Sequence, residues 1–457
     1  MNMLTDFKLP DAVKKIIRLL NQHHFEAFLV GGCVRDHLLH KQIHDYDIAT
    51  SALPSCVMEI FAPVCKVIPT GIRHGTVTLL TDGMEIEVTT YRIEQNYINH
   101  RTPSAVSFTD DLIQDLSRRD FTINAMAAHP DLGIIDPFGG QQDIKKGIIR
   151  TVGDPAVRME EDALRLLRAF RFYCSLGFNL DKELHSVIRQ KAGLLAFISK
   201  ERVRSELNRI LCSPKKQLLH EMLKLQLLPH IFPQLLPLIH LQQETPWHLY
   251  DVFDHTDHAL DQALGQPLVQ RLALIYHDCG KAFTKTYDQH HTAHFKGHAQ
   301  QSAQIAETAL RALTYDNKTI RHVCAIILLH DERLKPQEAA LRRFLLKTDF
   351  DYQLAYDVLQ VQICDNLAKN TEKTKAEIDG IKRSVQMIEE MEQNSFSLTL
   401  KELAVNGNDL KALGLQGKQI RDMLAFLLDH VIEQPKDNEK NILIQLALQR
   451  QAKKRII

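Results

Sequence analysis

The sequence lacks an apolar run long enough to cross a lipid bilayer, and its N-terminal segment MNMLTDFKLPDAV lacks the basic-then-apolar pattern of a secretory signal. These two absences predict a cytoplasmic protein with no membrane partner. The eight cysteines are scattered and include no CxxC pair. That pattern excludes a zinc ribbon or a disulfide scaffold and is typical of thiols kept reduced inside a cell.

An excess of charge of either sign is also absent, because 56 basic residues balance 56 acidic ones. A contact with nucleic acid would therefore depend on local basic patches rather than on an overall positive field. The length of 457 residues is too great for one ordinary core, so several packed units are expected. The oligomeric state is left open.

The pattern of hydrophobic residues changes along the chain. Up to about residue 150, β-rich runs such as YDIAT and EIEVTTYR mix with helical stretches, which predicts a small α/β head. From Arg158 onward the pattern is helical. The predicted parts are the head over 1–150, a helical neck over 151–220, a helical connector over 221–244, a histidine-rich helical domain over 245–370 and a helical tail over 371–457.

The segment FLVGGCVRDHLLHKQIHDYDIAT predicts a strand, a glycine turn, a helix and a second strand with two aspartates. Asp45 and Asp47 share one face of that strand, because alternate strand residues point the same way. A third acid on a neighbouring strand would complete a site for two Mg²⁺ ions, which activate a hydroxyl and neutralise a leaving pyrophosphate. The run EIEVTT supplies Glu85 and Glu87 as candidates.

The glycine turn and the helix after it suit a triphosphate. Gly31 and Gly32 allow backbone N–H groups to approach phosphate oxygens, and Arg35 can grip them. Taken singly, a GG turn and a solvated acidic strand face are ordinary features. Their order and spacing together favour a nucleotide site.

A second motif lies in RMEEDALRLLRAFRF, which predicts one amphipathic helix with Asp162 and Arg165 on neighbouring positions of one face. A carboxylate accepts from an exocyclic amino group, and a guanidinium donates to a ring nitrogen or carbonyl oxygen, so the pair suits cytosine or adenine. Without further context, a surface ion pair between them is the simpler interpretation.

With these motifs, residues 25–215 resemble the nucleotidyltransferase superfamily, and within it the class II tRNA nucleotidyltransferase and bacterial poly(A) polymerase family. The resemblance implies that a set of acidic residues binds the catalytic metal ions. Within that set it favours Glu87 over Glu85. It makes Glu161 to Arg165 the protein template that selects CTP and ATP. The implied catalytic and Mg²⁺-binding residues are Asp45, Asp47 and Glu87, and the implied nucleotide-binding residues are Gly31, Gly32, Arg35, Arg119, Asn124, Asp162, Arg165 and Arg168.

Two further blocks, SRRDFTINAMA and SKERVRSELNRIL, resemble motifs of the same family. In the first, Asp120 fits an orienting role. In the second, Arg202, Arg204 and Arg209 are predicted to contact the acceptor stem of tRNA, with bracing salt bridges as the alternative.

The polar stretch between Tyr91 and Arg118 has no strong periodicity and matches the mobile loop of members that add the terminal A. The resemblance therefore implies addition of CCA, or of its terminal A alone, to tRNA from CTP and ATP. Bacterial poly(A) polymerases remain an alternative, although they usually carry a basic C-terminal extension. Here the chain ends in only a short basic run, KKRII.

The histidine-rich region carries HDCGK and several other His and Asp motifs on separate predicted helices. It resembles the HD phosphohydrolase superfamily, which implies a divalent metal of unknown identity. The predicted ligands are His255, His277, Asp278 and Asp365, with His298 and His330 for a second metal or for orienting substrate. His248, His258 and His294 are expected to be packed or solvated. This domain is either a phosphohydrolase or a structural body that binds tRNA. A phosphohydrolase would be an additional activity or, in a rival interpretation, the principal one.

Overall fold

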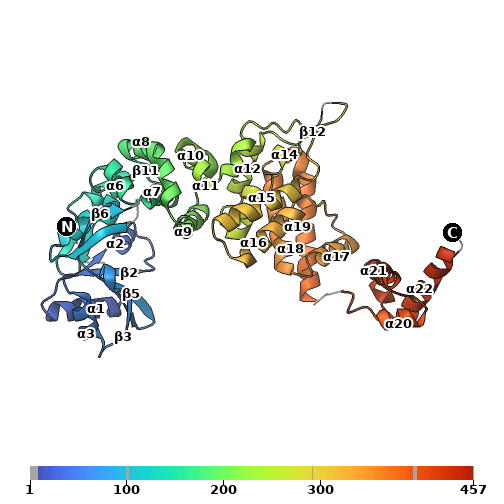
Figure 1. Cartoon of the computed structure of the whole chain (residues 1–457), viewed down its shortest axis with the longest axis horizontal. Coiled ribbons are helices and arrows are strands. Elements are labelled where there is room, and N and C mark those ends of the chain that lie inside the picture. Colours follow the sequence, from blue (N-terminus) through green and yellow to red (C-terminus); the bar gives the residue numbers. More distant parts are fainter. Residues whose placement is uncertain (1–8, 99–101, 291, 395–398, 456–457) are drawn as a thin grey trace. The chain divides into compact units, whose positions relative to one another are not determined.

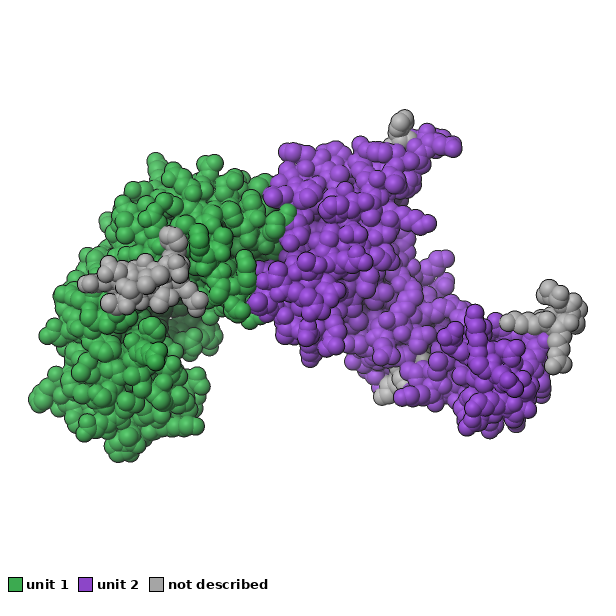
Figure 2. All heavy atoms as spheres, in the orientation of Figure 1, with its two compact units in different colours: residues 1–233 green, residues 234–457 purple. Residues whose placement is uncertain are grey.

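The computed structural model describes residues 9–98, 102–290, 292–394 and 399–455 (Figure 1). Contacts between Cα atoms divide the chain into two compact units, residues 1–233 and 234–457 (Figure 2). The boundary falls inside the predicted connector. The finer division into five parts remains a prediction. In the described part of the chain, no helix is both long and apolar enough to span a membrane.

Unit 1 is built on a seven-stranded mixed sheet in the order β3-β4-β5-β2-β1-β8-β9. Only the pairing of β2 with β5 is parallel, and it sets Asp47 directly opposite Glu87. The strands are β1 Ala27–Val30, β2 Tyr46–Thr50, β3 Lys66–Gly71, β4 Thr76–Thr81, β5 Met84–Thr90, β8 Ala127–His129 and β9 Gly133–Ile135.

The alternation in β2 and β5 decides which face of the sheet is covered. Ile48 and Val88 are fully buried in a core with the apolar face of helix α1 Asp11–Gln22 and with helix α3 Pro54–Phe61. Asp47 and Glu87 point to the other face, since strand side chains alternate. That face is partly covered by a second apolar cluster around Tyr91. The acidic end of the two strands is thus left accessible.

The rest of unit 1 is mainly helical, as predicted, with one short pair of parallel strands, β10 Ile148–Ile149 and β11 Asn179–Leu180. The helices are α2 Gly32–Leu38, α4 Leu112–Ser117, α5 Gly140–Lys146, α6 Pro155–Glu161, α7 Leu164–Leu176, α8 Lys182–Lys191, α9 Lys200–Leu211, α10 Leu218–Lys224 and α11 Leu228–Ile231, with single turns η1 Ile72–His74, η2 Thr122–Asn124 and η3 Ala192–Phe197.

The polar stretch after Tyr91, which shows no strong periodicity and resembles the mobile loop of the family, has regular structure. It forms an antiparallel hairpin of β6 Arg92–Ile98 and β7 Thr102–Phe108. Residues 99–101 lie outside the described part of the chain. A two-stranded ribbon satisfies its backbone groups by pairing with itself, so it needs no apolar alternation to form.

One correction concerns the predicted single helix over RMEEDALRLLRAFRF. The helix breaks at Asp162, whose backbone is extended (φ −137°, ψ 102°), so that α6 ends at Glu161 and α7 begins at Leu164. The Asp162 carboxylate accepts from the Leu164 N–H at 3.1 Å. Aspartate side chains compete in this way with the helical hydrogen bonds and start a new helix instead.

Unit 2 is mainly helical and carries one short hairpin, β12 Thr286–Tyr287 with β13 Ala293–His294. Its helices are α12 Val252–Gln262, α13 Leu268–Tyr276, α14 Lys281–Thr284, α15 His298–Ala312, α16 Asn317–Leu329, α17 Glu338–Lys347, α18 Tyr352–Leu367, α19 Thr371–Gln393, α20 Gly407–Ala412, α21 Lys418–Glu433 and α22 Lys440–Arg455, with the turn η5 Pro435–Asp437. A further turn, η4 Pro233–Leu238, spans the boundary between the units.

The glycine of HDCGK has a packing role. A Cβ at Gly280 would lie 2.3 Å from the His298 carbonyl oxygen and 2.8 Å from the Ser302 nitrogen, both in α15. The Gly280 N–H also donates to the Ser302 hydroxyl at 2.8 Å. The absent side chain therefore allows the backbone after the His-Asp pair to touch the start of α15.

We expect Gly280→Ala to lower the free energy of unfolding by about 2–3 kcal/mol, because backbone atoms must move to admit the methyl group. Gly380→Ala in α19 is the matched control, since nothing lies within 4 Å of its added Cβ. It should stabilise the protein by up to about 1 kcal/mol through helix propensity. Thermal unfolding of the full chain measures both, and equal effects would contradict the packing role.

Candidate functional site

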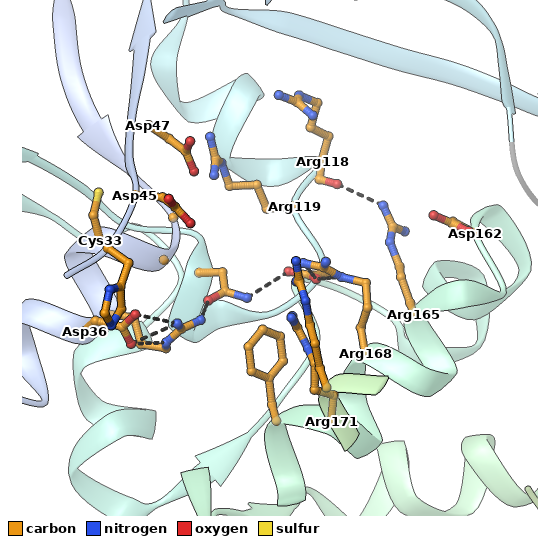
Figure 3. A pocket seen from close by; sticks show the side chains of 18 of the residues that line it. Cys33, Asp36, Asp45, Asp47, Arg118, Arg119, Asp162, Arg165, Arg168 and Arg171 are labelled. Atoms are coloured by element: carbon orange, nitrogen blue, oxygen red, sulfur yellow. Dashed lines mark hydrogen bonds and ion pairs between the residues drawn. The ribbon is translucent and has the colours of Figure 1, made fainter. Parts of the chain in front are cut away.

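A cavity of about 550 Å³ in unit 1 gathers most of the predicted nucleotide-binding residues (Figure 3). It is lined by Gly31, Gly32, Cys33, Arg35, Asp36, His44, Asp45, Asp47, Arg92, Glu94, Arg118, Arg119, Asp120, Asn124, Asp162, Arg165, Arg168, Arg171, Phe172 and Arg209. Every predicted nucleotide-binding residue is in this set. The cavity is therefore polar and rich in arginine, as a site for a polyphosphate requires.

The glycine turn forms one wall of this cavity. Gly31 has a φ of +77°, which favours glycine, and a Cβ there would lie 3.0 Å from Arg119 Nη1. Arg119 donates to Asp115 at 3.3 Å, while its Nε is buried without a hydrogen-bond partner. The Nη1 atom, which lies beside the glycine turn, is the donor placed to meet a phosphate oxygen.

The three predicted catalytic carboxylates lie close together in the sheet, where Asp45 and Asp47 line the cavity and Glu87, on β5, is not among its lining residues. Asp47 faces Glu87 across the parallel register, and Asp45 immediately precedes β2. Glu85 precedes that register, as Asp45 does, but Glu87 and not Glu85 is among the groups that raise the pKa of Asp47. The geometry thus favours Glu87 over Glu85 as the third acid.

The electrostatics of Asp47 fit a cation. Burial, the Glu87 carboxylate and the Asp45 carboxylate raise the pKa of Asp47 to about 6, against the opposing effect of Arg119. The three acids do not form a compact group with all ligand atoms within 4.8 Å, as described residues of unit 2 do.

A chain of polar contacts joins the predicted phosphate-binding residues. Arg35 Nη1 donates to Asn124 Oδ1 at 2.6 Å, and Asn124 Nδ2 donates to Asp120 Oδ1 at 3.2 Å. Arg168 Nε then donates to Asp120 Oδ2 at 2.6 Å. Burial alone would raise the pKa of Asp120, but Arg168 and Arg165 hold it below its usual value. Asp120 therefore stays ionised and orients its neighbours.

The predicted base-reading pair, Asp162 and Arg165, lines the cavity, and each residue pairs with another partner there. Asp162 accepts from Arg202 Nη2 at 2.8 Å, and Arg165 Nη1 donates to Glu161 at 2.6 Å. Arg165 Nη2 also donates to the Arg118 carbonyl at 3.1 Å. Each charge of the pair is thus held by its own partner.

The structure places the three predicted RNA-binding arginines in different surroundings. Arg202 is engaged by Asp162, and Arg209 lines the cavity. Arg204 lies on the same helix, α9, but is not among the lining residues. Their role toward tRNA remains a prediction.

Sequence reasoning missed the aromatic centre of the cavity, Phe172. Three guanidinium groups lie over its ring, those of Arg35 at 5.0 Å, Arg168 at 5.8 Å and Arg171 at 4.4 Å from the centroid. The spacing of Arg165, Arg168 and Arg171 along α7 was a usable signal, since residues three apart share a helix face. Cation–π contacts here hold several like charges in one place.

A second site lies wholly within unit 2 and consists of the six predicted metal ligands. His255 comes from α12, His277 and Asp278 follow α13, His298 begins α15, His330 ends α16 and Asp365 lies near the end of α18. All six are buried. His255 Nε2 lies 2.8 Å from Asp365 Oδ1, and His298 Nε2 lies 3.3 Å from His330 Nε2. The helices therefore bring all six residues into one cluster, named here the His–Asp cluster.

Three histidines of the His–Asp cluster are oriented alike. The Nδ1 atoms of His277, His298 and His330 contact carbonyl oxygens three residues earlier, at 2.7, 2.9 and 2.6 Å. Donation from Nδ1 leaves a lone pair on Nε2, which is the atom that faces the cluster. His277 Nε2 is buried without a hydrogen-bond partner. Such aligned lone pairs beside two carboxylates fit a divalent metal.

The aspartates of the His–Asp cluster balance its charge. Burial would lower the pKa of His277, but Asp278 and Asp365 raise it to about 10, so without a metal its Nε2 carries a proton that a divalent ion must displace. Asp278 Oδ2 lies 3.3 Å from His277, whereas Asp278 Oδ1 lies 3.6 Å from His298. Two compact ligand groups result, His255 with His277 and Asp365, and His277 with Asp278 and His330.

The histidines that were expected to be packed or solvated lie outside the His–Asp cluster. His258 stacks on Tyr250 at 4.2 Å between ring centroids, and exposed His294 pairs with Asp288 at 2.9 Å. His248 packs edge-on against His255 at 5.3 Å and lines the neighbouring cavity.

The raised pKa of Asp47 predicts that its ionised carboxylate, the form that binds a metal ion, lowers the stability of the metal-free protein. The pKa in the folded state is above the unfolded value of 3.8, so ionisation of Asp47 opposes folding. The loss of stability develops as the pH rises from about 4 to about 6 and is complete at pH 8. Without divalent ions at pH 8, Asp47→Asn should raise the free energy of unfolding by about 1–2 kcal/mol.

Calorimetric unfolding in EDTA measures this effect, and the difference from wild type should shrink at pH 4. Glu59→Gln on α3 is the control, because Glu59 is exposed. An Asp47→Asn protein that is less stable than wild type at pH 8 would contradict the argument.

Comparison with known proteins gives matches along most of the chain. Residues 27–150 match the poly A polymerase head domain, residues 177–239 match the probable RNA and SrmB-binding site of polymerase A, and residues 289–447 match the putative tRNA nucleotidyltransferase domain 2. CCA-adding enzymes of Geobacillus sp. (strain WCH70) and Lactobacillus helveticus (strain DPC 4571) are 51% identical over 199 residues and 50% over 202 residues. These alignments cover 44% of this chain and only 48% and 50% of the relatives, so the chain spans about half the length of the curated relatives it matches.

Solved structures extend the similarity over the whole chain. A crystal structure of the Bacillus stearothermophilus CCA-adding enzyme in complex with CTP is 30% identical, with a TM-score of 0.68, over 98% of this chain and 99% of that one. The Thermotoga maritima CCA-adding enzyme complexed with tRNA-CCA is 22% identical, with a TM-score of 0.58 over 98% and 97% of the two chains, and it shows the shared fold alone. The predicted fold class and family are confirmed, and the chain belongs to the CCA-adding enzyme family.

Proposed function

We propose that unit 1 transfers CMP and AMP from CTP and ATP to the 3′-hydroxyl of tRNA and so builds its CCA end. The observation that carries this proposal is the parallel register of Asp47 and Glu87 beside the Gly31 turn. The same cavity holds Asp162 and Arg165. A polyphosphate grip, two of the three carboxylates, Asp45 and Asp47, and a pair of base-reading groups therefore share one cavity of nucleotide size, and Glu87 lies beside Asp47 on the neighbouring strand.

Asp45, Asp47 and Glu87 would hold divalent ions, proposed to be Mg²⁺, which activate the hydroxyl and neutralise the leaving group. The hydroxyl oxygen bonds to the α-phosphorus of the nucleotide, the bond to pyrophosphate breaks, and the hydroxyl proton passes to solvent water. Arg119 and Arg35 offer donors to the triphosphate. In this arrangement the protein needs only to position the two substrates and to compensate the charge of the reacting phosphates.

Base selection follows from the two held charges. The Asp162 carboxylate would accept from the exocyclic amino group of cytosine or adenine, and Arg165 would donate to the ring. Arg202 and Glu161 fix the two side chains in advance. Guanine and uracil present the wrong donors and acceptors and would leave a desolvated charge unpaired.

The named relatives support CCA addition over the poly(A) alternative, since they are CCA-adding enzymes and include structures with CTP and with tRNA. On this proposal tRNA is the partner, and Arg202, Arg204 and Arg209 belong to the surface near its acceptor end. A cytoplasmic location agrees with that substrate. We keep the five-part division of the chain as part of the proposal.

Purified protein with Mg²⁺ should add three nucleotides to a tRNA that ends before CCA when CTP and ATP are both present, and then stop. The test uses tRNAs ending before the CCA, after C and after CC, with the products resolved on a sequencing gel. Addition only to the CC-ended tRNA would restrict the activity to the terminal A. Long A tails would contradict the proposal in favour of poly(A) polymerisation.

Two glutamates of β5 supply the matched control for that assay. Glu87→Gln should reduce transfer about 100-fold or more, because it removes a charge beside the reacting phosphate. Glu85→Gln should leave transfer within about tenfold of wild type, since Glu85 lies outside the β2 register. The reverse order would exclude Glu87 as the third acid.

A second function is favoured by the His–Asp cluster, and we propose that it is a divalent-metal centre for hydrolysis of phosphate esters. His255, His277, Asp278, His298, His330 and Asp365 would hold the metal, which supplies an activated water and neutralises phosphate charge. Water oxygen bonds to phosphorus, the ester P–O bond breaks, and the proton lost by water passes to the leaving alkoxide. The identity of the metal is left open.

Calorimetric titration of the full chain with Mn²⁺, Ni²⁺ or Zn²⁺ should give at least one site that His277→Ala removes, because His277 belongs to both compact ligand groups. His258→Ala is the matched control, since His258 stacks on Tyr250 outside the His–Asp cluster. Asp47→Asn should leave this site unchanged. Metal binding that survives His277→Ala would reject the proposed centre.

A further inference from the structure

Helix α4 of unit 1 carries a fully buried carboxylate, that of Asp115. Asp115 is not among the residues that line the nucleotide cavity, but Arg118 and Arg119, which it contacts, both line it. Burial of a carboxylate is costly unless charged donors satisfy its oxygens. The partners of Asp115 therefore indicate its role.

The two oxygens of the Asp115 carboxylate have different partners. Oδ1 accepts from Arg118 Nε at 3.0 Å and Nη2 at 2.8 Å, and from the backbone N–H of Arg92 at 3.3 Å. Oδ2 accepts from Arg119 Nη2 at 3.3 Å. Burial alone would raise the pKa of Asp115, but Arg118 and Arg119 hold it below its usual value. The carboxylate is therefore ionised, and one of its oxygens serves Arg119.

Arg119 has a second acid close by. Figure 3 shows Arg119 beside Asp47 in the cavity. A Cβ at Gly31 would lie 3.0 Å from Arg119 Nη1 and 3.9 Å from Asp47 Oδ2, so both side chains border the glycine turn. Burial and Glu87 raise the pKa of Asp47, and the charge of Arg119 opposes them. Asp115 and Asp47 thus both attract the same guanidinium group.

The contact with Asp115 determines where this guanidinium group lies. A guanidinium is a planar fork of donors, so Nη2 can be held by Asp115 while Nη1 stays beside the glycine turn. Without that contact, Coulomb attraction would draw Arg119 toward Asp47, where its charge would oppose the binding of a metal ion. Arg119 would then no longer be held where a triphosphate enters.

We propose that Asp115 is a positioning residue of the nucleotide site, which anchors Arg119 at the glycine turn and keeps it from pairing with Asp47. This inference rests on the proposed transfer function and adds a residue that contacts neither the nucleotide nor the metal ions. Arg119 meets the triphosphate rather than the base, so its anchor serves CTP and ATP alike.

Asp115→Asn removes the anchor with little change of shape. The variant keeps one carbonyl oxygen, which is expected on the Oδ1 side, where donors from Arg118 and Arg92 converge. The amide NH₂ group then faces Arg119 and cannot accept from it. Calorimetric titration of the full chain in Mg²⁺ without tRNA should give an affinity about 10-fold lower for both CTP and ATP. A loss for one nucleotide only would overturn the proposal.

A double-mutant cycle with Arg119→Gln separates positioning from a general structural role. If Asp115 acts through Arg119, Asp115→Asn should change the CTP affinity less than about twofold when Arg119→Gln is also present. The same loss in both backgrounds would overturn the proposal. Asp143→Asn is the matched control, because Asp143 is buried, pairs with Arg150 at 3.3 Å and is not a lining residue. A 10-fold loss in this control would count equally against the positioning role.

Arg119→Lys supplies a test that leaves Asp115 in place, should Asp115→Asn not fold. A lysine carries one point charge rather than a fork, so it cannot contact Asp115 and the triphosphate at the same time. Arg119→Lys should therefore bind CTP about 10-fold more weakly than wild type. Wild-type affinity in this variant would show that no anchor is needed and would overturn the proposal.

The outcomes distinguish this inference from the proposed function, because binding is measured without tRNA. Transfer of CMP and AMP to tRNA by the wild type, with unchanged CTP affinity in Asp115→Asn, would support the function and reject the positioning role. The expected loss of affinity in a protein that transfers nothing would support the positioning role and reject the function.

Discussion

The parallel pairing of β2 with β5 is the constraint on which the rest of unit 1 depends. It sets the carboxylates of Asp47 and Glu87 side by side on the accessible face of a sheet whose other face is a closed apolar core. Like charges so placed repel each other, and the raised pKa of Asp47 records that repulsion together with burial. The fold thus holds two carboxylates together against their repulsion, and a bound cation would relieve that repulsion.

The arginines of the cavity create the reverse electrostatic problem, because they concentrate positive charge as the carboxylates concentrate negative charge. A polyphosphate needs several positive charges near one point, and these repel one another until the ligand arrives. Asp120, Glu161 and Glu206 pair with these arginines, and the Phe172 ring lies under three of the guanidinium groups. These partners hold donors in place before binding, which lowers the entropy lost when a nucleotide is bound.

The carboxylate site could be predicted from the sequence because its physics is local. Strand alternation puts Asp45 and Asp47 on one face, and a neighbouring strand with E-x-T-T offers the third acid. The break at Asp162 could not be predicted from periodicity, since the residues on both sides of it favour a helix. The helix breaks at Asp162 because its side chain accepts a hydrogen bond from the Leu164 N–H. The same side chain forms an ion pair with Arg202, forty residues away in the sequence.

Longer-range features were missed for the same reason. The hairpin of β6 and β7 forms because each strand pairs with the other, and its polar side chains carry no signal of burial. Phe172 is apolar at a helical spacing typical of a core residue, and nothing in its local sequence shows that Arg35, from the first βα turn, reaches its ring. The His–Asp cluster was easier to predict, because His277 and Asp278 are adjacent and follow an apolar helix that fixes where they point.

The two units solve the problem of concentrated carboxylates differently, and the difference bears on what each can bind. In unit 1 the acids remain accessible and the arginines stand across the cavity, so that metal ions and a large, mobile polyphosphate can enter between them. In unit 2 the aspartates are buried and each carries a lysine within 2.7 Å, so the charge is nearly balanced before any ligand arrives. A balanced, buried cluster attracts a small anion only weakly from a distance, because its net field is low. Any ligand of that cluster would therefore have to be held by short-range contacts.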